Sequence, residues 1–171
     1  MEAVMVKIIS SSAKKICDQI NFSEMTYKNN GIIIRFKDQG SVQRYDYRSS
    51  RAQREAFRRN ASVLFDCFWK YINKTGGSGL YIASSEDAPC RVNRFDILYS
   101  VSKSDRVILT DSKKITRRAF MKALRYELHP VFVIENGDLA IMPTDHLDMF
   151  IASKDGAYPE ELNPLLETVE W

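Results

Sequence analysis

The stretch RSSRAQREAFRRNASVLFDCFWKYI, residues 48–72, carries the clearest helical pattern of the chain and decides its fold. Its apolar side chains recur at intervals of three and four residues, which places them on one face of a helix. A helix with such a face is stable in water only when that face is buried. We therefore predict a helix over residues 51–72 with a buried side. The residues on that side are Phe57, Ala61, Leu64, Phe68, Tyr71 and Ile72.

The 171-residue chain has the composition of a folded protein, with 44% hydrophobic and 27% charged residues. This content supports one substantial core and excludes the disordered and fibrous classes. No run reaches the ~18 apolar residues that a membrane helix needs. Residues 1–15 also lack the basic start and long apolar stretch of a signal peptide. We expect a cytoplasmic protein with no membrane partner, and its oligomeric state stays open.

The cysteines and histidines do not form a recognisable chemical site. Cys17, Cys67 and Cys90 are odd in number and lack the paired spacing of a zinc or redox motif. We expect reduced thiols and predict that Cys67 is a core residue, since free cysteines are usually buried. His129 and His146 have no nucleophile at a telling spacing, so structural roles are favoured. These residues predict no metal site and no cofactor.

Charge is distributed unevenly along the chain. The total is +3, but residues 145–171 hold seven acids and one base, a net charge of −6, so residues 1–144 carry +9. A basic body with an acidic end is typical of proteins that contact nucleic acid or a charged protein partner. The alternative is a mixed, solvated surface, because Lys and Arg are common everywhere outside a core.

The remaining elements come from turn residues and from runs of β-branched and aromatic residues. A second helix is predicted over residues 116–128, with Thr116 as its N-cap and Pro130 at its end. A last short helix would begin at Thr144 or Asp145 and carry Leu147, Phe150 and Ile151. Strands are predicted at 4–9, 31–37, 41–47, 80–83, 94–101, 106–110, 131–134 and 139–142.

Together these elements predict an α+β fold in which a mixed, mainly antiparallel sheet packs against the two main helices. Residues 1–154 would form a single domain, with 1–72 and 80–154 as alternative sub-units joined by 73–79. The Gly-Gly-Ser-Gly run at residues 76–79 reads equally as a natural loop or as an engineered linker. Residues 155–171 are predicted to be an acidic C-terminal tail on the surface or frayed.

The first part of the chain resembles a known family. Adjacent serines close to the first strand precede the hairpin-like sequence GIIIRFKDQGSVQRYDYRS, residues 31–49, which ends in aromatic residues and leads into the helix. This arrangement is similar to the KTSC domain, a small β-rich module, over residues 4–72. The resemblance implies nucleic-acid binding, by association, and carries no catalytic residues.

Basic side chains gather on the two predicted helices and suggest a binding function. Like charges on one helix face repel one another unless an anion lies against them, and arginine binds phosphate with two parallel hydrogen bonds. The candidate phosphate-binding residues are Arg48, Arg51, Arg54, Arg58, Arg59, Lys70, Arg117, Arg118, Lys122 and Arg125. Tyr45, Tyr47 and Trp69 are candidates for stacking on unpaired bases.

These residues favour a non-catalytic, nucleic-acid-binding accessory protein. The sequence does not separate DNA from RNA. The alternative is that the basic faces are ordinary solvated helix surfaces and the aromatic rings belong to the core.

A metal-dependent nuclease is the second hypothesis. Asp96 lies in a predicted strand, and Asp111-Ser112-Lys113 closes the next one. The predicted order over residues 51–134 is αβββαβ, which resembles the core of the PD-(D/E)xK nucleases. The resemblance implies that Asp96, Asp111 and Lys113 are catalytic and that the acids hold Mg²⁺. An acid-x-Lys triplet also arises by chance, and then Asp96 would pair with an arginine and Asp111 would cap a helix.

A third hypothesis needs no site for a small molecule or a metal. A small α+β protein with this charge distribution could be an inhibitor or adaptor, of the kind that phages and mobile elements encode, which binds an acidic protein partner. Exposed aromatic residues and arginines are enriched at the centres of protein interfaces. The residues that suggest nucleic-acid binding therefore suggest a protein partner as well.

Overall fold

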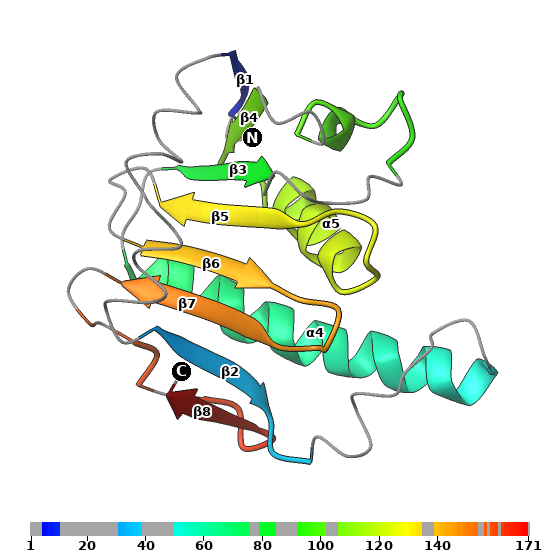
Figure 1. The fold of residues 1–171 in the computed structure, drawn as a ribbon, viewed down its shortest axis with the longest axis vertical. Helices are drawn as coiled ribbons and strands as arrows, with labels where there is room; N and C mark the ends of the chain where they lie inside the picture. Colours follow the sequence, from blue (N-terminus) through cyan, green and yellow to red (C-terminus); the bar gives the residue numbers. More distant parts are fainter. Residues whose placement is uncertain are drawn as a thin grey trace.

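The computed structural model describes residues 5–10, 31–38, 50–75, 79–84, 92–101, 106–134, 139–153, 156, 158–160 and 162–170. Two α-helices, one short 3₁₀-helix and eight strands lie in these ranges, which confirms the α+β class (Figure 1). In chain order the elements are β1 (Val6–Ser10), β2 (Ile32–Phe36), α4 (Arg51–Lys74), β3 (Leu80–Ser84), η1 (Ile97–Tyr99), β4 (Arg106–Thr110), α5 (Lys113–Ala123), β5 (Pro130–Ile134), β6 (Leu139–Pro143), β7 (Met149–Ser153) and β8 (Leu166–Glu170).

The eight strands form one sheet in the order β1-β4-β3-β5-β6-β7-β2-β8, from top to bottom in Figure 1. Every pair among the described strands is antiparallel, so the sheet is simpler than the mixed one expected. Six of the predicted strands are confirmed, at β1, β2, β3, β4, β5 and β6. The predicted strand at 41–47 lies outside the described residues.

One row of apolar residues crosses the sheet from strand to strand. It runs through direct cross-strand partners Ile8, Ile108, Ile82, Phe132, Ile141, Ile151 and Ile32. Side chains alternate between the two faces of a strand, so the neighbours of this row point the other way. On that second face Val131, Val133, Ala140 and Ala152 form a smaller buried cluster.

Helix α4 follows the predicted pattern closely. Ser50 caps it, because its side chain accepts a hydrogen bond from the backbone nitrogen of Gln53 at 3.1 Å. The helix continues two residues past the predicted end at Ile72, to Lys74. All six predicted apolar residues are buried, together with Phe65. The sequence prediction for this element is confirmed.

Helix α5 begins and ends earlier than predicted. Ser112 is its N-cap, with its side chain accepting from the nitrogen of Ile115, while Thr116 is fully buried within the helix. The predicted cap at Thr116 is therefore wrong. The helix stops at Ala123, and Tyr126 then turns the chain with a φ of 55°. Phe120, Ala123, Leu124 and Leu128 are all buried, so this segment packs one side against the core.

Both helices lie on one face of the sheet, behind it in Figure 1. Four aromatic rings join the helices to the sheet: Phe65 and Phe68 on α4, Phe120 on α5 and Phe132 on β5. The centroid of Phe68 lies 4.9 Å from those of Phe120 and Phe132, and the centroids of Phe65 and Phe120 are 5.4 Å apart. Rings at these separations and tilts attract one another beyond their apolar burial. This cluster fixes α5 against α4 and the sheet.

The predicted strand at 94–101 is wrong. Residues 93–96 form a turn, and Ile97–Tyr99 form the 3₁₀-helix η1, which Asp96 caps by accepting from the nitrogen of Leu98 at 3.1 Å. Leu98 and Val101 are both fully buried. Their separation of three residues matches the 3₁₀ period rather than the two-residue period of a strand. The predicted order αβββαβ therefore loses one strand.

The predicted last helix is also wrong, because Met149–Ser153 is strand β7 and pairs with β6 and β2. Thr144 and Asp148 instead close a turn, in which the hydroxyl of Thr144 donates to the carboxylate of Asp148 and Leu147 has a φ of 57°. The tail prediction fails for Leu166–Glu170, which is strand β8. There Glu167 pairs with Arg35 of β2 at 2.8 Å.

Candidate nucleic-acid interface

The two helices run antiparallel and bring both predicted basic faces together. The Arg117 guanidinium donates to the Ser62 hydroxyl at 3.0 Å and lies 5.4 Å from the centre of the Phe65 ring. Near the start of α5, Lys113 lies 5.8 Å from the centre of the Trp69 ring. Beyond the end of α5, Arg125 borders a hollow of about 190 Å³ with Arg54, Phe57 and Arg58 near the start of α4.

A larger groove of about 450 Å³ follows the exposed side of α5. Arg125 borders both this groove and the smaller hollow, so the two depressions adjoin. We call the cations along them the basic surface. Its members are Arg54, Arg58, Lys114, Arg117, Arg118, Lys122 and Arg125.

Two described carboxylates contact the basic surface. Asp96 pairs with Arg118 at 2.7 Å, and Glu127 pairs with Lys122 at 3.1 Å. The seven cations of the basic surface therefore outnumber the described acids that pair with it. A concave surface with such an excess attracts anions and concentrates them locally. Arginine adds directed hydrogen bonds that match a phosphate or a carboxylate.

Other predicted phosphate-binding residues lie elsewhere. Arg51 pairs with Glu55 at 2.9 Å and does not line the hollow that Arg54 and Arg58 border. Arg59 follows Arg58, so it points about 100° further round the helix. Lys70 borders depressions on the opposite side of α4, beside Cys67. Arg48 lies outside the described residues.

Of the predicted stacking residues, Trp69 is described, and its ring does not lie open at this surface. Trp69 is half-buried and packs almost parallel to Phe65, with 6.1 Å between ring centroids and 19° between planes. Lys113 also lies near its ring. Tyr45 and Tyr47 are outside the described residues.

The three residues of the nuclease hypothesis each have a different partner. Asp96 caps η1 and pairs with Arg118, the carboxylate of Asp111 accepts from the nitrogen of Met5 at 2.9 Å, and Lys113 lies near Trp69. Within the described residues, no three His, Cys, Asp or Glu side chains lie together in a way that could hold a metal ion.

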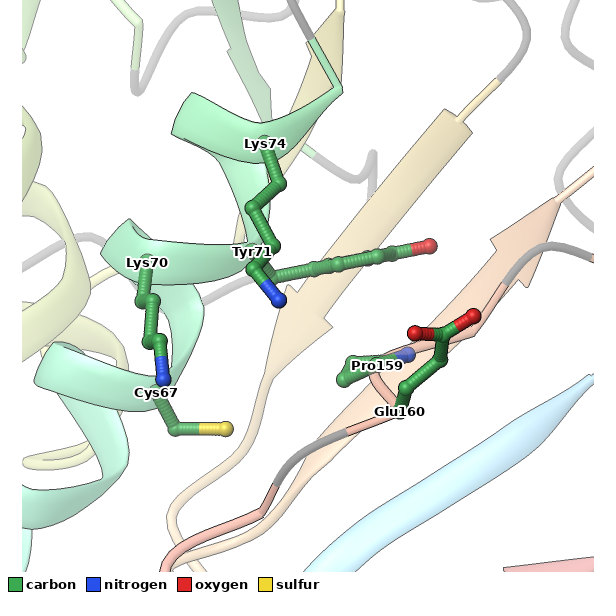
Figure 2. A pocket seen from close by; sticks show the side chains of 6 residues that line it. All are labelled: Cys67, Lys70, Tyr71, Lys74, Pro159 and Glu160. Atoms are coloured by element: carbon green, nitrogen blue, oxygen red, sulfur yellow. The ribbon is translucent and has the colours of Figure 1, made fainter.

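The opposite side of α4 has a different character. Figure 2 shows a small pocket there, with the Cys67 sulfur and the Tyr71 ring extending from α4 toward the side where Pro159 and Glu160 lie. Lys70 and Lys74 are the cations around it, and Asp66 borders the adjoining hollow of about 480 Å³. Among the described residues that line these two depressions, cations and carboxylates are therefore balanced.

Cys67 is half-buried against the core rather than fully enclosed. Burial raises the pKa of its thiol to about 11, despite the nearby charge of Lys70, which lowers it. A thiol of this kind is a poor nucleophile, because the thiolate is the reactive form. Cys17 and Cys90 lie outside the described residues.

The histidines make local contacts. The ring of His129 lies 4.8 Å from that of Tyr126, between centroids, and His146 lies 3.9 Å from the carboxylate of Asp145. Neither residue borders the basic surface or the depressions beside Cys67.

Sequence reasoning missed one residue of the basic surface and one exposed ring close to it in the chain. Lys114 borders the groove, and its position four residues before Arg118 on the same helix was the available signal. Phe95 precedes Asp96 and is 83% exposed. Phe95 lies within the strand predicted at 94–101, and a ring in a strand is expected to pack on a face of the sheet.

Comparison of the chain with protein-family models, with curated proteins and with solved structures found no match. Among the helices of the described residues, none is long and apolar enough to cross a membrane.

Proposed function

We propose that this protein binds nucleic acid without cleaving it and that the basic surface between α4 and α5 holds the phosphates. The observation that carries the proposal is the continuity of the surface. Arg54 and Arg58 from one helix and four cations from the other border two adjoining depressions, and Arg125 borders both. Neither helix alone has this concentration of charge.

The chemistry of the cations supports a phosphate ligand. Four or more guanidinium groups present planar donors, which suit the closely spaced oxygens of phosphates along a nucleic-acid backbone. Binding of that kind releases the counterions of the nucleic acid, so its affinity falls steeply with salt. A surface built for one small anion would need fewer cations and a closed pocket.

The first test exchanges charge at two neighbouring positions of α4. Arg58→Glu removes a cation of the basic surface, while Arg59→Glu makes the same charge change on another side of the helix. We expect Arg58→Glu to weaken binding to labelled DNA or RNA by roughly tenfold and to lower the salt slope by about 1. Arg59→Glu should keep the wild-type affinity within about twofold. Fluorescence anisotropy at several salt concentrations measures both.

Two results would contradict the proposal. Equal losses in the two variants would mean that net charge matters and the basic surface does not. Affinity that is independent of salt would mean that phosphates are not the contact. The double variant Arg54→Glu/Arg58→Glu should show a loss of about a hundredfold with unchanged circular dichroism, which separates binding from folding.

The nuclease hypothesis stays a prediction that the same assay checks. Adding Mg²⁺ to the binding reactions and following the length of the labelled strand would reveal cleavage. Cleavage that Asp96→Ala abolishes would favour the nuclease over simple binding. If no oligonucleotide binds or is cut, the hypothesis of an acidic protein partner takes precedence.

A further inference from the structure

Phe95 is the most exposed of the large apolar side chains in the described part of the chain, at 83%. Its neighbours Val92, Leu98 and Val101 are all buried, so the segment is anchored to the core on both sides of the ring. The exposed ring leaves a large apolar surface in water, and covering that surface with a ligand would be favourable. The position of this ring calls for a role outside the core.

Hydrogen bonds hold the turn that presents the ring. The Asn93 side chain accepts from the nitrogen of Phe95 at 3.0 Å, and the Asn93 carbonyl accepts from the nitrogen of Asp96 at 2.8 Å. Asp96 then caps η1 through Leu98. The ring of Phe95 therefore projects from a turn that is fixed at three points, and little conformational freedom is lost when something binds to it.

The turn also joins the ring to the basic surface. Asp96, the next residue, borders the groove and pairs with Arg118 at 2.7 Å. Arg94, the preceding residue, places its guanidinium 4.9 Å from the centre of the Phe95 ring. Phe95 is thus the chain neighbour of a residue that lines the groove, and a guanidinium lies against its ring.

We propose that Phe95 is a stacking platform for an unpaired base and that the ligand of the basic surface is single-stranded nucleic acid. This inference rests on the proposed function. Proteins that bind single strands combine a cationic groove for the backbone with an aromatic ring on which a base stacks. A paired base inside a duplex cannot reach such a ring, so Phe95 discriminates between single and double strands.

The test compares three probes of the same length, about 12 nucleotides, within the site size of such proteins. They are a single strand, the corresponding duplex, and a single strand whose bases are replaced by abasic sites. Phe95→Ala should weaken binding of the single strand by about 5- to 150-fold, the effect of losing one stacked base. Its affinity for the duplex and for the abasic strand should match that of the wild-type protein.

Three variants complete the design. Leu165→Ala removes another exposed apolar side chain, 56% exposed, which borders neither depression of the basic surface and should change no affinity. Phe95→Trp should keep single-strand binding, because indole also stacks, and Phe95→Leu should lose it. In Phe95→Ala the salt slope should stay at the wild-type value, since no phosphate contact is removed.

The outcomes separate this inference from the proposed function. If Phe95→Ala binds the single strand as tightly as wild type, or loses the same factor on all three probes, the stacking role is wrong while phosphate binding stands. If Phe95→Leu matches Phe95→Trp, the ring makes a merely apolar contact and stacking is again wrong. If wild type binds none of the probes, the proposed function itself fails.

Discussion

The two sides of α4 contain similar residues and yet differ in charge. On the side facing α5, seven cations meet two described carboxylates. On the side facing residues 158–163, Lys70 and Lys74 are matched by Asp66 and Glu160. The helix supplies two cations to each side. The difference comes from the neighbour, because α5 adds cations and the C-terminal segment adds an acid.

This comparison shows that a basic surface arises from packing rather than from one helix. On an isolated helix, Arg54 and Arg58 would be two ordinary solvated cations that contribute little to the binding of an anion. They gain significance because the aromatic cluster holds α5 antiparallel to α4 and places Arg125 beside them. Three changes test this difference between the two sides of α4: detaching α5, alkylating Cys67 and removing one acid.

Detaching α5 should have the largest effect. Phe120→Ala empties the centre of the aromatic cluster and should lower the free energy of unfolding by about 3–5 kcal/mol. Because Phe120 also sets the position of α5, nucleic-acid binding should weaken even where the variant is still folded. Val63→Ala, on the other side of α4, should cost roughly 1 kcal/mol and leave binding unchanged. Urea denaturation followed by circular dichroism measures both, and similar costs would refute the role of the cluster.

The reactivity of Cys67 tests the side of α4 that faces away from the basic surface. Its thiol, with a pKa of about 11 instead of the ordinary 9.0, holds about a hundredth as much thiolate at pH 8. Alkylation of the Cys67 peptide by iodoacetamide should therefore be about a hundredfold slower in the folded protein than in urea. The rate should rise about tenfold per pH unit up to pH 11. Peptide mass spectrometry follows it, and equal rates in buffer and urea would contradict the burial of this thiol.

Removing one acid should have the smallest effect. Asp96→Asn releases Arg118 and adds one positive charge to the groove, so affinity for nucleic acid should rise by a few-fold. The asparagine oxygen can still accept from the nitrogen of Leu98, and stability should change by less than about 1 kcal/mol. The same substitution at Asp66, beyond the basic surface, is the control. Weaker binding by Asp96→Asn would mean that its carboxylate helps to hold the ligand.

Local patterns predicted the parts of the fold that depend on local physics. The three- and four-residue spacing from Phe57 to Ile72 identified α4, and β-branched runs such as residues 32–34 identified strands. The basic residues of both helices were also recognisable in the sequence. Their convergence was not, because it depends on the antiparallel packing of α4 and α5, which leaves no local signal.

The wrong predictions arose where hydrogen bonds or strand pairing, rather than the hydrophobic pattern, decided the structure. Residues 94–101 resemble a strand, but the hydrogen bonds of Asn93 and Asp96 turn the chain there. Strand β8 was not predicted because its acids suggest a solvated tail. In the structure these acids occupy the exposed and half-buried positions of an edge strand, while Leu166 is buried. The prediction for β7 failed because the apolar pattern of residues 149–153 suits a helix as well as a strand. Pairing with β2 and β6 selects the strand.

The strand order also determines when the molecule can be completed during synthesis. β2 lies between β7 and β8, and Ile32 pairs with both Ile151 and Glu170. β1 at the other edge has β4 as its described partner. Contacts between such distant residues slow folding, since long loops must close before any pairing is gained. During synthesis the first two strands must therefore wait for their final neighbours. β2 stays unpaired with them until residues 149–170 have left the ribosome. A nascent chain with such unpaired strands depends on protection from aggregation.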